Sequence, residues 1–206
     1  MFRAARSNAF TLIELLIVVA IIAILAAIAV PNFLEAQVRA KVARCKGDMR
    51  SMATGVEAYM VDNNTYPLYG RITQAGVVEP ICAGVGGAAT PDQNEFVATG
   101  LTTPVAYITS RFVDPFATQV PGPEPFIRYL NYISMKQHFS LPGAPPAPVQ
   151  QDLLAKTGLW RMIGCGPDLD RGADTKFKNL VYDASNGTVS DGDIVRTQLK
   201  SESVAR

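Results

Sequence analysis

The sequence predicts an α+β fold in which one long N-terminal helix spans a membrane with its first half and packs its second half on a small antiparallel sheet. Residues 10–30 form an apolar run of 21 residues, long enough to cross a bilayer. Apolar residues at helical spacing then continue to about residue 62. Further along the chain, short segments rich in aromatic and β-branched residues alternate with turn residues, which is typical of antiparallel strands.

Composition and motifs exclude several classes of function. The chain has 206 residues with 19 Lys and Arg against 18 Asp and Glu, a net charge of +1. That balance gives no general electrostatic basis for binding nucleic acid. The sequence contains no P-loop, dinucleotide fingerprint or G-x-S-x-G motif, and His138 is its single histidine. We therefore expect neither an enzyme nor a nucleic-acid-binding protein.

The N-terminus has the features of a membrane-inserted segment. Residues 1–9 contain Arg3 and Arg6 and no acidic residue, whereas residues 10–30 carry one charge, Glu14. At about 1.5 Å per residue this helix is about 31 Å long, which matches a hydrocarbon core of about 30 Å. Basic residues before a span favour a cytoplasmic start. We therefore expect the rest of the chain to lie on the far side of the membrane.

Three interpretations fit this hydrophobic pattern. The first is a plain signal-anchor helix. The second is a cleaved secretory signal, with Ala27-Ile28-Ala29 as its small-x-small cleavage site. The third is a short leader that is cut before Phe10, with the apolar helix retained in the mature protein.

Glu14 favours the third interpretation. A carboxylate inside an apolar span costs about 2.5–3.5 kcal/mol at the bilayer centre and less near its edge, and such acids usually have a partner. A cut before Phe10 creates an α-amine four residues from Glu14. This amine is mostly positive near neutral pH, so it can neutralise the carboxylate within one helix or between neighbouring subunits.

Residues 9–16, Ala-Phe-Thr-Leu-Ile-Glu-Leu-Leu, resemble the class III signal of type IV pilins and pseudopilins. That signal has a short basic leader, a small residue and then Phe-Thr-Leu-Ile-Glu. The small residue is usually Gly, and this chain has Ala9 in its place. Pro31, followed by Asn32-Phe33, also matches a proline that pilins commonly carry.

This resemblance implies how the N-terminus is processed. A prepilin peptidase, an inner-membrane aspartic protease, would cut between Ala9 and Phe10 and N-methylate Phe10. Glu14 would bind the terminal amine of a neighbouring subunit during assembly. The chain would then be a substrate rather than an enzyme. It would be a single-pass protein of the bacterial inner membrane, with its C-terminal domain in the periplasm or, after assembly, at the cell surface.

Within this family, the expected match is the major pseudopilin of type II secretion systems. Asp114-Pro115-Phe116 resembles the Asp-Pro-Trp-Gly stretch of major pseudopilins, without the glycine. Such a subunit assembles with copies of itself and minor pseudopilins, and an inner-membrane platform and its ATPase drive the filament that exports proteins. Two alternatives stay open. One is a type IV pilus subunit for adhesion, motility or DNA uptake, and the other is an exported membrane-anchored domain with binding or enzymatic function.

Residues 31–62 are expected to continue as an amphipathic helix into the globular domain. Its apolar positions recur mostly at steps of three or four and are Leu34, Val38, Val42, Cys45, Met49, Met52, Val56, Tyr59 and Met60. Pro31 predicts a kink, because it removes one backbone hydrogen bond. Gly47 and Gly55 are expected to weaken the helix. Asp62-Asn63-Asn64 predicts its end.

Residues 63–206 form the expected globular domain, with variable loops between the helix and the sheet. The strand candidates are residues 126–134, 159–164, 179–183 and 188–189. Asn186-Gly187 between the last two is a strong hairpin-turn signal. Residues 91–100 predict a short helix, whereas the prolines of residues 142–148 predict a polyproline-like surface loop.

Three carboxylates near the C-terminus, Asp168, Asp170 and Asp174, lie at short spacing among glycines. Oxygen ligands in this arrangement suit Ca²⁺, although the pattern is not an EF-hand. Major pseudopilins carry a calcium site in their C-terminal loop, and Asp168 follows a stretch in the matching place. The resemblance therefore implies Ca²⁺ as a cofactor, with Asp191 and Asp193 as weaker candidate ligands. A solvated acidic turn is the alternative.

The chain has three cysteines, and none forms a C-x-x-C pair, so neither a zinc site nor a thioredoxin-like site is indicated. Cys82 and Cys165 both lie in the later part of the chain. If that part is exported, they can form a disulfide, and two unlinked thiols are the alternative. Cys45 falls in the helical pattern and is expected in the core.

Overall fold

The computed structural model describes residues 10–72, 78–80, 96–116, 129–140, 144–167, 169, 182–183 and 192–200. The chain divides into two compact units, residues 1–37 and 38–206, and each is described by itself. The helix α1, Leu12–Asn63, begins in the first unit and ends in the second.

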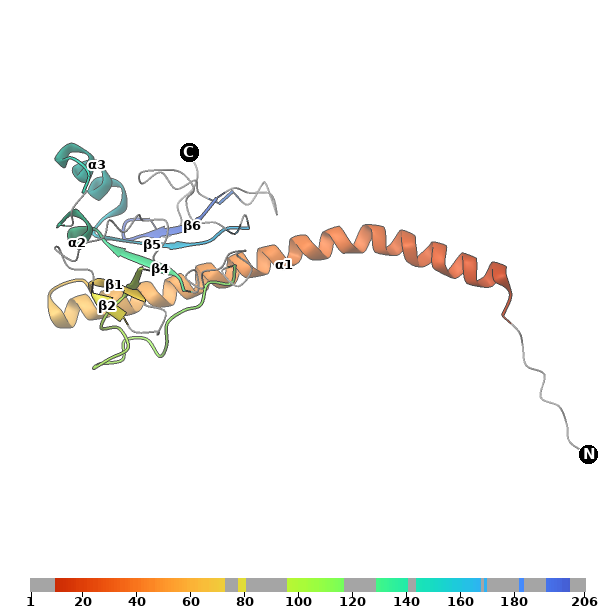
Figure 1. The fold of residues 1–206 in the computed structure, drawn as a ribbon, viewed down its shortest axis with the longest axis horizontal. Coiled ribbons are helices and arrows are strands. Elements are labelled where there is room, and N and C mark those ends of the chain that lie inside the picture. Colours follow the sequence, from red (N-terminus) through yellow and green to blue (C-terminus); the bar gives the residue numbers. More distant parts are fainter. Residues whose placement is uncertain are drawn as a thin grey trace, which may run out of the picture. The chain divides into compact units, whose positions relative to one another are not determined.

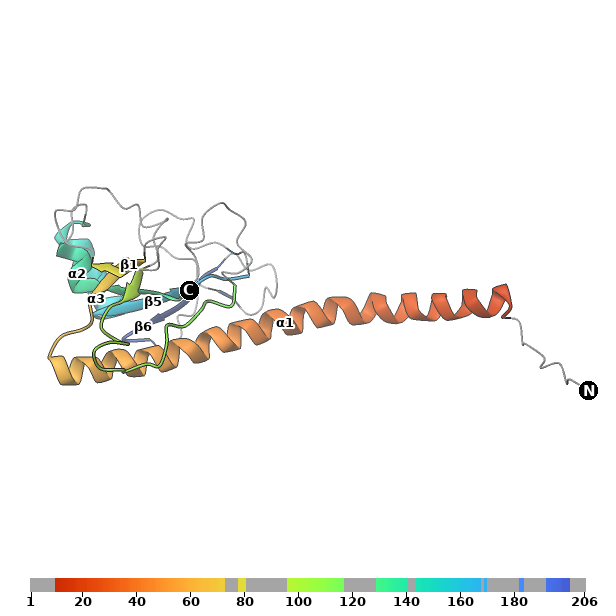
Figure 2. The same cartoon turned by 60° about the horizontal axis from the view of Figure 1, so that its bottom comes forward.

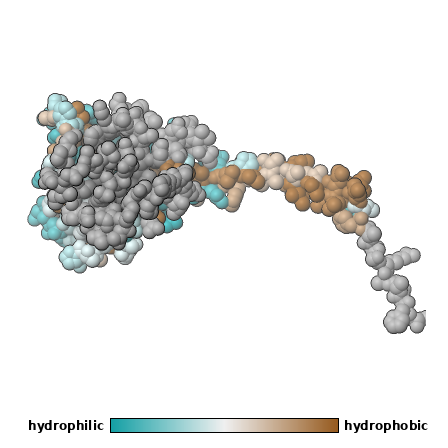
Figure 3. All heavy atoms as spheres, viewed as in Figure 1, coloured by the Kyte–Doolittle hydropathy of each residue, from teal (hydrophilic) through white to brown (hydrophobic). Residues whose placement is uncertain are grey.

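The first unit contains the apolar part of α1 (Figure 1). An 18-residue window of this helix has a mean hydropathy of 3.1 and none of it is buried, so by length and composition it can cross a membrane. Figure 3 shows its apolar side chains gathered along the surface. The helix continues through Pro31 without a break, which is compatible with a proline because neighbouring groups can satisfy one freed carbonyl.

The second part of α1 buries one face in the second unit. Its buried residues are Val42, Cys45, Met49, Met52, Ala53, Gly55 and Val56. Their spacing places them on one side of the helix, as the apolar pattern predicted, whereas Leu34 at the start of that pattern is 51% exposed. The helix ends at Asn63, at the predicted stop, and Asn64 adopts a positive φ of 53°.

Two three-stranded antiparallel sheets follow α1 in the chain. The first has the order β2-β1-β3, with β1 at Tyr69–Ile72, β2 at Val78–Pro80 and β3 at Phe96–Ala98. The second has the order β4-β5-β6, with β4 at Asn131–Ser134, β5 at Trp160–Gly164 and β6 at Ile194–Thr197. In its register Asn131 pairs with Ile163, and Gly164 pairs with Ile194. Figures 1 and 2 both show this sheet beside the second part of α1, which confirms the predicted α+β fold.

Two glycines permit close packing around α1. A Cβ added to Gly164 in β5 would lie 2.8 Å from Cys45 Sγ and 3.2 Å from Met49 Cε, so a side chain there would separate helix and sheet. A Cβ added to Gly55 would lie 2.7 Å from Ile108 Cγ2. Gly55 therefore has a packing role that its helix propensity did not reveal. Gly47, by contrast, has nothing within 4 Å of its added Cβ.

Two predictions in the globular domain need correction. The helix predicted over residues 91–100 is wrong, because β3 occupies Phe96–Ala98 and pairs with β1. The proline-rich loop predicted over residues 142–148 is wrong in its last part, because α3 (Ala147–Thr157) begins there with a proline in its first turn. A proline costs little at that point, since its missing N–H would have no partner within the helix.

His138 lies in another short helix, α2 (Met135–Ser140). The predicted strand of residues 126–134 is observed as β4 from Asn131 onward, and residues 117–128 lie outside the described part. The second predicted strand agrees with β5 within one residue. The predicted Asn186-Gly187 hairpin lies outside the described residues.

Candidate functional site

The candidate site is the start of α1, where Thr11 and Glu14 form a reciprocal pair. Glu14 Oε2 accepts hydrogen bonds from the backbone N–H of Thr11 at 2.8 Å and from its hydroxyl at 2.7 Å. Thr11 Oγ1 in turn accepts a hydrogen bond from the backbone N–H of Glu14 at 3.3 Å. This is a capping box, which satisfies donors that the first helical turn leaves without partners. Phe10 lies just before the helix and is 71% exposed.

The capping box fixes the position of the one carboxylate in the apolar segment. Both bonds from Thr11 engage Oε2, and among the described residues nothing donates to Oε1 of Glu14. One carboxylate oxygen is therefore held by its own helix, and the other remains for a cation from elsewhere. The sequence carries this signal as Thr-x-x-Glu before an apolar run, although Thr11 was not among the predicted site residues.

The surface around this carboxylate is apolar and uncovered. Every residue from 10 to 34 is exposed, including Leu12 at 80% and Ile24 at 63%. A continuous apolar surface of this length is not stable in water. A bilayer or the apolar helices of neighbouring subunits can cover it.

The remaining predicted site residues fall in two groups. Ala9 lies outside the described residues, as do Asp168, Asp170, Asp174 and Asp191. In the described part of the chain no group of three or more His, Cys, Asp or Glu side chains is placed to hold a metal ion. The predicted cleavage position and the predicted calcium ligands therefore stay predictions.

Asp193, the remaining weak calcium candidate, lies near a buried guanidinium. Its side chain is 2% exposed. Burial lowers the pKa of Arg161 to about 10, and the negative charge of Asp193 opposes that shift. Asp193 thus provides a counter-charge for Arg161.

The predicted disulfide between Cys82 and Cys165 stays a prediction, because Cys82 lies outside the described residues. Cys165 is buried and directly follows β5. Cys45 is also a buried thiol, in the core position that the helical pattern predicted.

Asp114, in the Asp-Pro-Phe motif, is completely buried and braces the domain. Its Oδ1 accepts a hydrogen bond from the N–H of Phe116 at 3.0 Å, and its Oδ2 accepts one from the N–H of Cys165 at 2.7 Å. Phe116 is 1% exposed, with Lys41 Nζ at 5.6 Å from its ring centroid. The motif therefore connects the end of β5 to α1, which is a structural role.

Glu57 connects α1 to the sheet by a second polar network. Its carboxylate accepts hydrogen bonds from Trp160 Nε1 at 2.8 Å and from the Tyr66 hydroxyl at 3.0 Å. Gln198 donates to the same hydroxyl at 2.6 Å and accepts from the N–H of Leu159 at 2.7 Å. Burial, with a contribution from Glu57, raises the pKa of Tyr66 to about 12. This network joins α1, β5 and the segment after β6.

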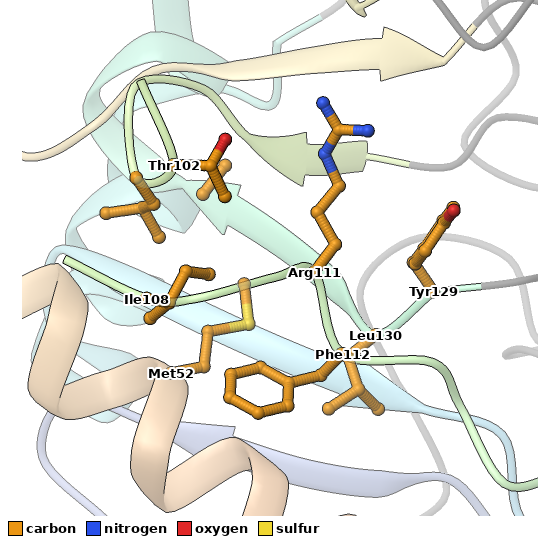
Figure 4. A pocket seen from close by; sticks show the side chains of 9 residues that line it. Met52, Thr102, Ile108, Arg111, Phe112, Tyr129 and Leu130 are labelled. Atoms are coloured by element: carbon orange, nitrogen blue, oxygen red, sulfur yellow. The ribbon is translucent and has the colours of Figure 1, made fainter. Parts of the chain in front are cut away.

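A small cavity lies between α1 and the segment after β3 (Figure 4). Met52, Ile108, Phe112 and Leu130 line it, with Arg111 beside it. Its volume of about 10 Å³ is at the lower limit for one water molecule. It is a packing defect and not a site for a substrate.

Comparisons with known proteins place the similarity at the N-terminus. The prokaryotic N-terminal methylation motif matches residues 4–30. Over 61 residues the chain is 46% identical to the type IV major pilin protein PilA of Myxococcus xanthus, covering 30% of this chain and 28% of that protein. Over 75 residues it is 39% identical to type II secretion system core protein G of Pseudomonas aeruginosa, covering 36% and 53%.

The longest of these matches reaches into the globular domain. The chain is 28% identical over 113 residues to core protein G of Pectobacterium carotovorum, covering 55% of this chain and 64% of that protein. The chain therefore spans less than two thirds of the length of each of these relatives. No solved structure is significantly similar. These findings confirm the resemblance to type IV pilin-like proteins, including the core pseudopilin of type II secretion.

Proposed function

We propose that this chain is a structural subunit of a type II secretion pseudopilus, which assembles through its N-terminal helix to drive protein export. The observation that carries the proposal is Glu14, a carboxylate in an uncovered apolar helix with one oxygen bound by Thr11. The methylation motif over residues 4–30 and the similarity to core protein G support the same conclusion.

In this proposal a prepilin peptidase cuts between Ala9 and Phe10 and methylates the new amine of Phe10. The amine is then positive and lies beside an apolar surface. Oε1 of Glu14 receives the amine of a neighbouring subunit, while Thr11 continues to hold Oε2. Pairing the two charges removes the cost of leaving either one isolated in an apolar environment. The apolar helices then pack against one another in the filament.

The proposed partners follow from this assembly. They are copies of the same chain, minor pseudopilins, the prepilin peptidase, an inner-membrane platform with its ATPase, and the lipid bilayer. The chain itself catalyses nothing in this scheme. Its C-terminal domain lies in the periplasm or, after assembly, at the cell surface.

The proposed orientation depends on the processing motif, because the count of basic residues does not favour it. Arg3 and Arg6 precede the apolar segment, whereas five Lys and Arg residues follow it within 20 residues of Val30. Orientation normally correlates with an excess of Lys and Arg on the cytoplasmic side. The leader must nevertheless reach the peptidase, which supports the proposed orientation.

Replacing Glu14 by Ala tests the proposed role directly. The variant should insert into the membrane at the normal level, since it loses a costly charge. It should fail to form filaments, because the amine of the neighbour then has no partner. Filaments are measured by electron microscopy and by cross-linking in cells that contain the secretion system. Glu35→Ala is the matched control in the same helix, and normal filaments from Glu14→Ala would refute the role.

A type IV pilus subunit is the second candidate, favoured by the 46% identity to the pilin PilA over 61 residues. Both classes share the same N-terminal signal, so that identity does not separate them. Deleting the gene distinguishes the two. Loss of an exported protein from the medium supports the pseudopilin, whereas loss of motility, adhesion or DNA uptake supports the pilus subunit.

We also propose Asp168, Asp170 and Asp174 as ligands of Ca²⁺ in the C-terminal loop. The support is the chemistry of three closely spaced carboxylates, together with the resemblance to major pseudopilins. Adding a chelator should lower the melting temperature of the full chain in detergent, and added Ca²⁺ should restore it. If the chelator leaves the melting temperature unchanged, the proposed calcium site is wrong.

A further inference from the structure

Basic side chains are concentrated in α1 directly after its apolar segment. Lys and Arg occur at positions 39, 41, 44, 46 and 50, and Asp48 is the one acidic residue between positions 39 and 50. All five basic residues are exposed or half-buried. Arg44 pairs with Asp48 at 3.7 Å, with 70% of its own side chain exposed. Such surface pairs are weak, so the pair does not remove Arg44 from other interactions.

The first three basic residues point in different directions round the helix. With 3.6 residues per turn, Arg39, Lys41 and Arg44 lie at about 0°, 200° and 140°. The ammonium group of Lys41 lies 5.6 Å from the ring centroid of Phe116, beside the globular domain. A flat protein surface can meet one side of a helix. A layer of lipid headgroups surrounds a helix that emerges from a bilayer, and it can meet all three residues.

Measured along the helix backbone, Arg39 lies within the thickness of a headgroup layer, and Lys41 and Arg44 lie beyond it. Leu34 is the last strongly exposed apolar residue before this segment, at 51%. At about 1.5 Å per residue, Arg39 lies about 7.5 Å beyond it, Lys41 about 10.5 Å and Arg44 about 15 Å. The headgroup layer extends about 5–8 Å beyond the hydrocarbon.

The direction of the side chains improves this fit. Side chains on a helix lean towards its N-terminus, which here is the direction of the apolar segment. Long Arg and Lys side chains also extend their charged ends towards a membrane surface. Arg39 and Lys41 therefore reach the headgroups, and Arg44 reaches their outer edge. Lys46 and Arg50 lie about 18 and 24 Å beyond Leu34, outside that layer.

We propose that Arg39, Lys41 and Arg44 bind the phosphate groups of anionic lipids on the side of the membrane where the globular domain lies. This contact holds the subunit at the membrane surface before assembly, and it must be released when a subunit enters a filament. The proposal requires membrane insertion and does not depend on the filament being a pseudopilus. Lipid binding also gives a role to the basic residues that follow the apolar segment, whose number the preference of Lys and Arg for the cytoplasmic side does not explain.

The test measures which lipids surround the full chain in phosphatidylcholine vesicles. The chain carries Arg3→Gln and Arg6→Gln, so that the leader does not contribute. Spin-labelled phosphatidylglycerol should associate with it at least about twofold more than spin-labelled phosphatidylcholine, because basic residues attract anionic lipids. This preference should disappear in R39Q/K41Q/R44Q and persist in the matched control K46Q/R50Q. Circular dichroism checks that both variants keep their helix.

Measurements in salt distinguish binding of lipid headgroups from binding of free anions. They use the unsubstituted basic segment, so they do not depend on whether the variants fold. In 1 M NaCl the preference should disappear, since the screening length falls to about 3 Å. At a lower ionic strength that leaves part of the preference, inorganic phosphate should reduce it no more than NaCl does at that ionic strength. A stronger effect of phosphate would indicate a site for free anions and contradict the proposal. Equal association of phosphatidylglycerol and phosphatidylcholine with the chain would also overturn the proposal. So would an equal loss of the phosphatidylglycerol preference in R39Q/K41Q/R44Q and in K46Q/R50Q. Determining the first residue of the mature protein tests the proposed processing independently. Lipid binding can therefore fail while processing is confirmed, and processing can fail while lipid binding is confirmed.

Discussion

At the scale of single residues, two of the three glutamates of α1, Glu14 and Glu57, show how a carboxylate is stabilised in different surroundings. Glu57 lies against the globular domain, and donors from Trp160 and Tyr66 satisfy it. Glu14 lies in an apolar segment, and the described donors come from Thr11 in its own first turn. The network of Glu57 is complete within one chain. Among the described residues nothing donates to Oε1 of Glu14, which is the property that the proposed assembly requires.

His138 provides a residue-scale prediction for the dependence of stability on pH. Burial, together with the smaller effect of the nearby charge of Arg161, lowers the pKa of His138 to about 4, and Nδ1 of the ring lies 3.1 Å from the Tyr69 hydroxyl. The folded pKa is below the unfolded value of about 6.5. The resulting stability is therefore present above pH 6.5 and lost as the pH falls towards 4.

Urea unfolding of the full chain in detergent at pH 7 and pH 4.5 measures this loss. Replacing His138 by Gln should reduce the part of the loss that occurs between those two values. Because His138 is the single histidine, its imidazole signal in NMR also reports its titration without ambiguity. A midpoint near 6.5 in the folded protein would contradict the prediction.

At the scale of elements, α1 contains two glycines with opposite expected effects. Gly47→Ala should stabilise the protein by about 0.5–1 kcal/mol, because nothing lies within 4 Å of the added Cβ and Ala is the better helix former. Gly55→Ala should destabilise it, because the added Cβ would lie 2.7 Å from Ile108 Cγ2. Urea unfolding of the two variants measures both effects. A shift of the same sign in both would contradict the packing described here.

The same scale shows which elements the sequence could predict. Apolar spacing predicted α1, and aromatic and β-branched residues predicted β4 and β5, because these signals are local. The helix expected at residues 91–100 was wrong because β3 is stabilised by pairing with β1, which local propensity does not report. The helix α3 was missed because its prolines were interpreted as a loop, although they lie at its start.

At the scale of the whole molecule, the N-terminal candidate residues could be predicted from the sequence. The long-range hydrogen bonds of the globular domain could not. Phe10 and Glu14 stand out because one charge interrupts an apolar run, and Thr11 was readable as part of a capping box. The bond from Cys165 to Asp114 joins residues 51 positions apart, and the bond from Trp160 to Glu57 joins residues 103 apart. One sequence contains no signal for such distant pairs.

The chain as a whole combines an uncovered apolar helix with a folded domain that has its own core. Such an apolar surface needs a bilayer or other apolar helices to cover it. In our proposals, the carboxylate of Glu14 serves the assembly of a filament, and the basic residues after the span serve the contact with the membrane.

Mass spectrometry of the N-terminus of the chain, purified from bacterial membranes that contain a prepilin peptidase, tests the central claim most directly. The account predicts a mature protein that begins at Phe10 with an N-methyl group, because residues 4–30 carry the methylation motif. A chain that still begins at Met1, or one that begins at Val30 after cleavage as a secretory signal, would contradict it.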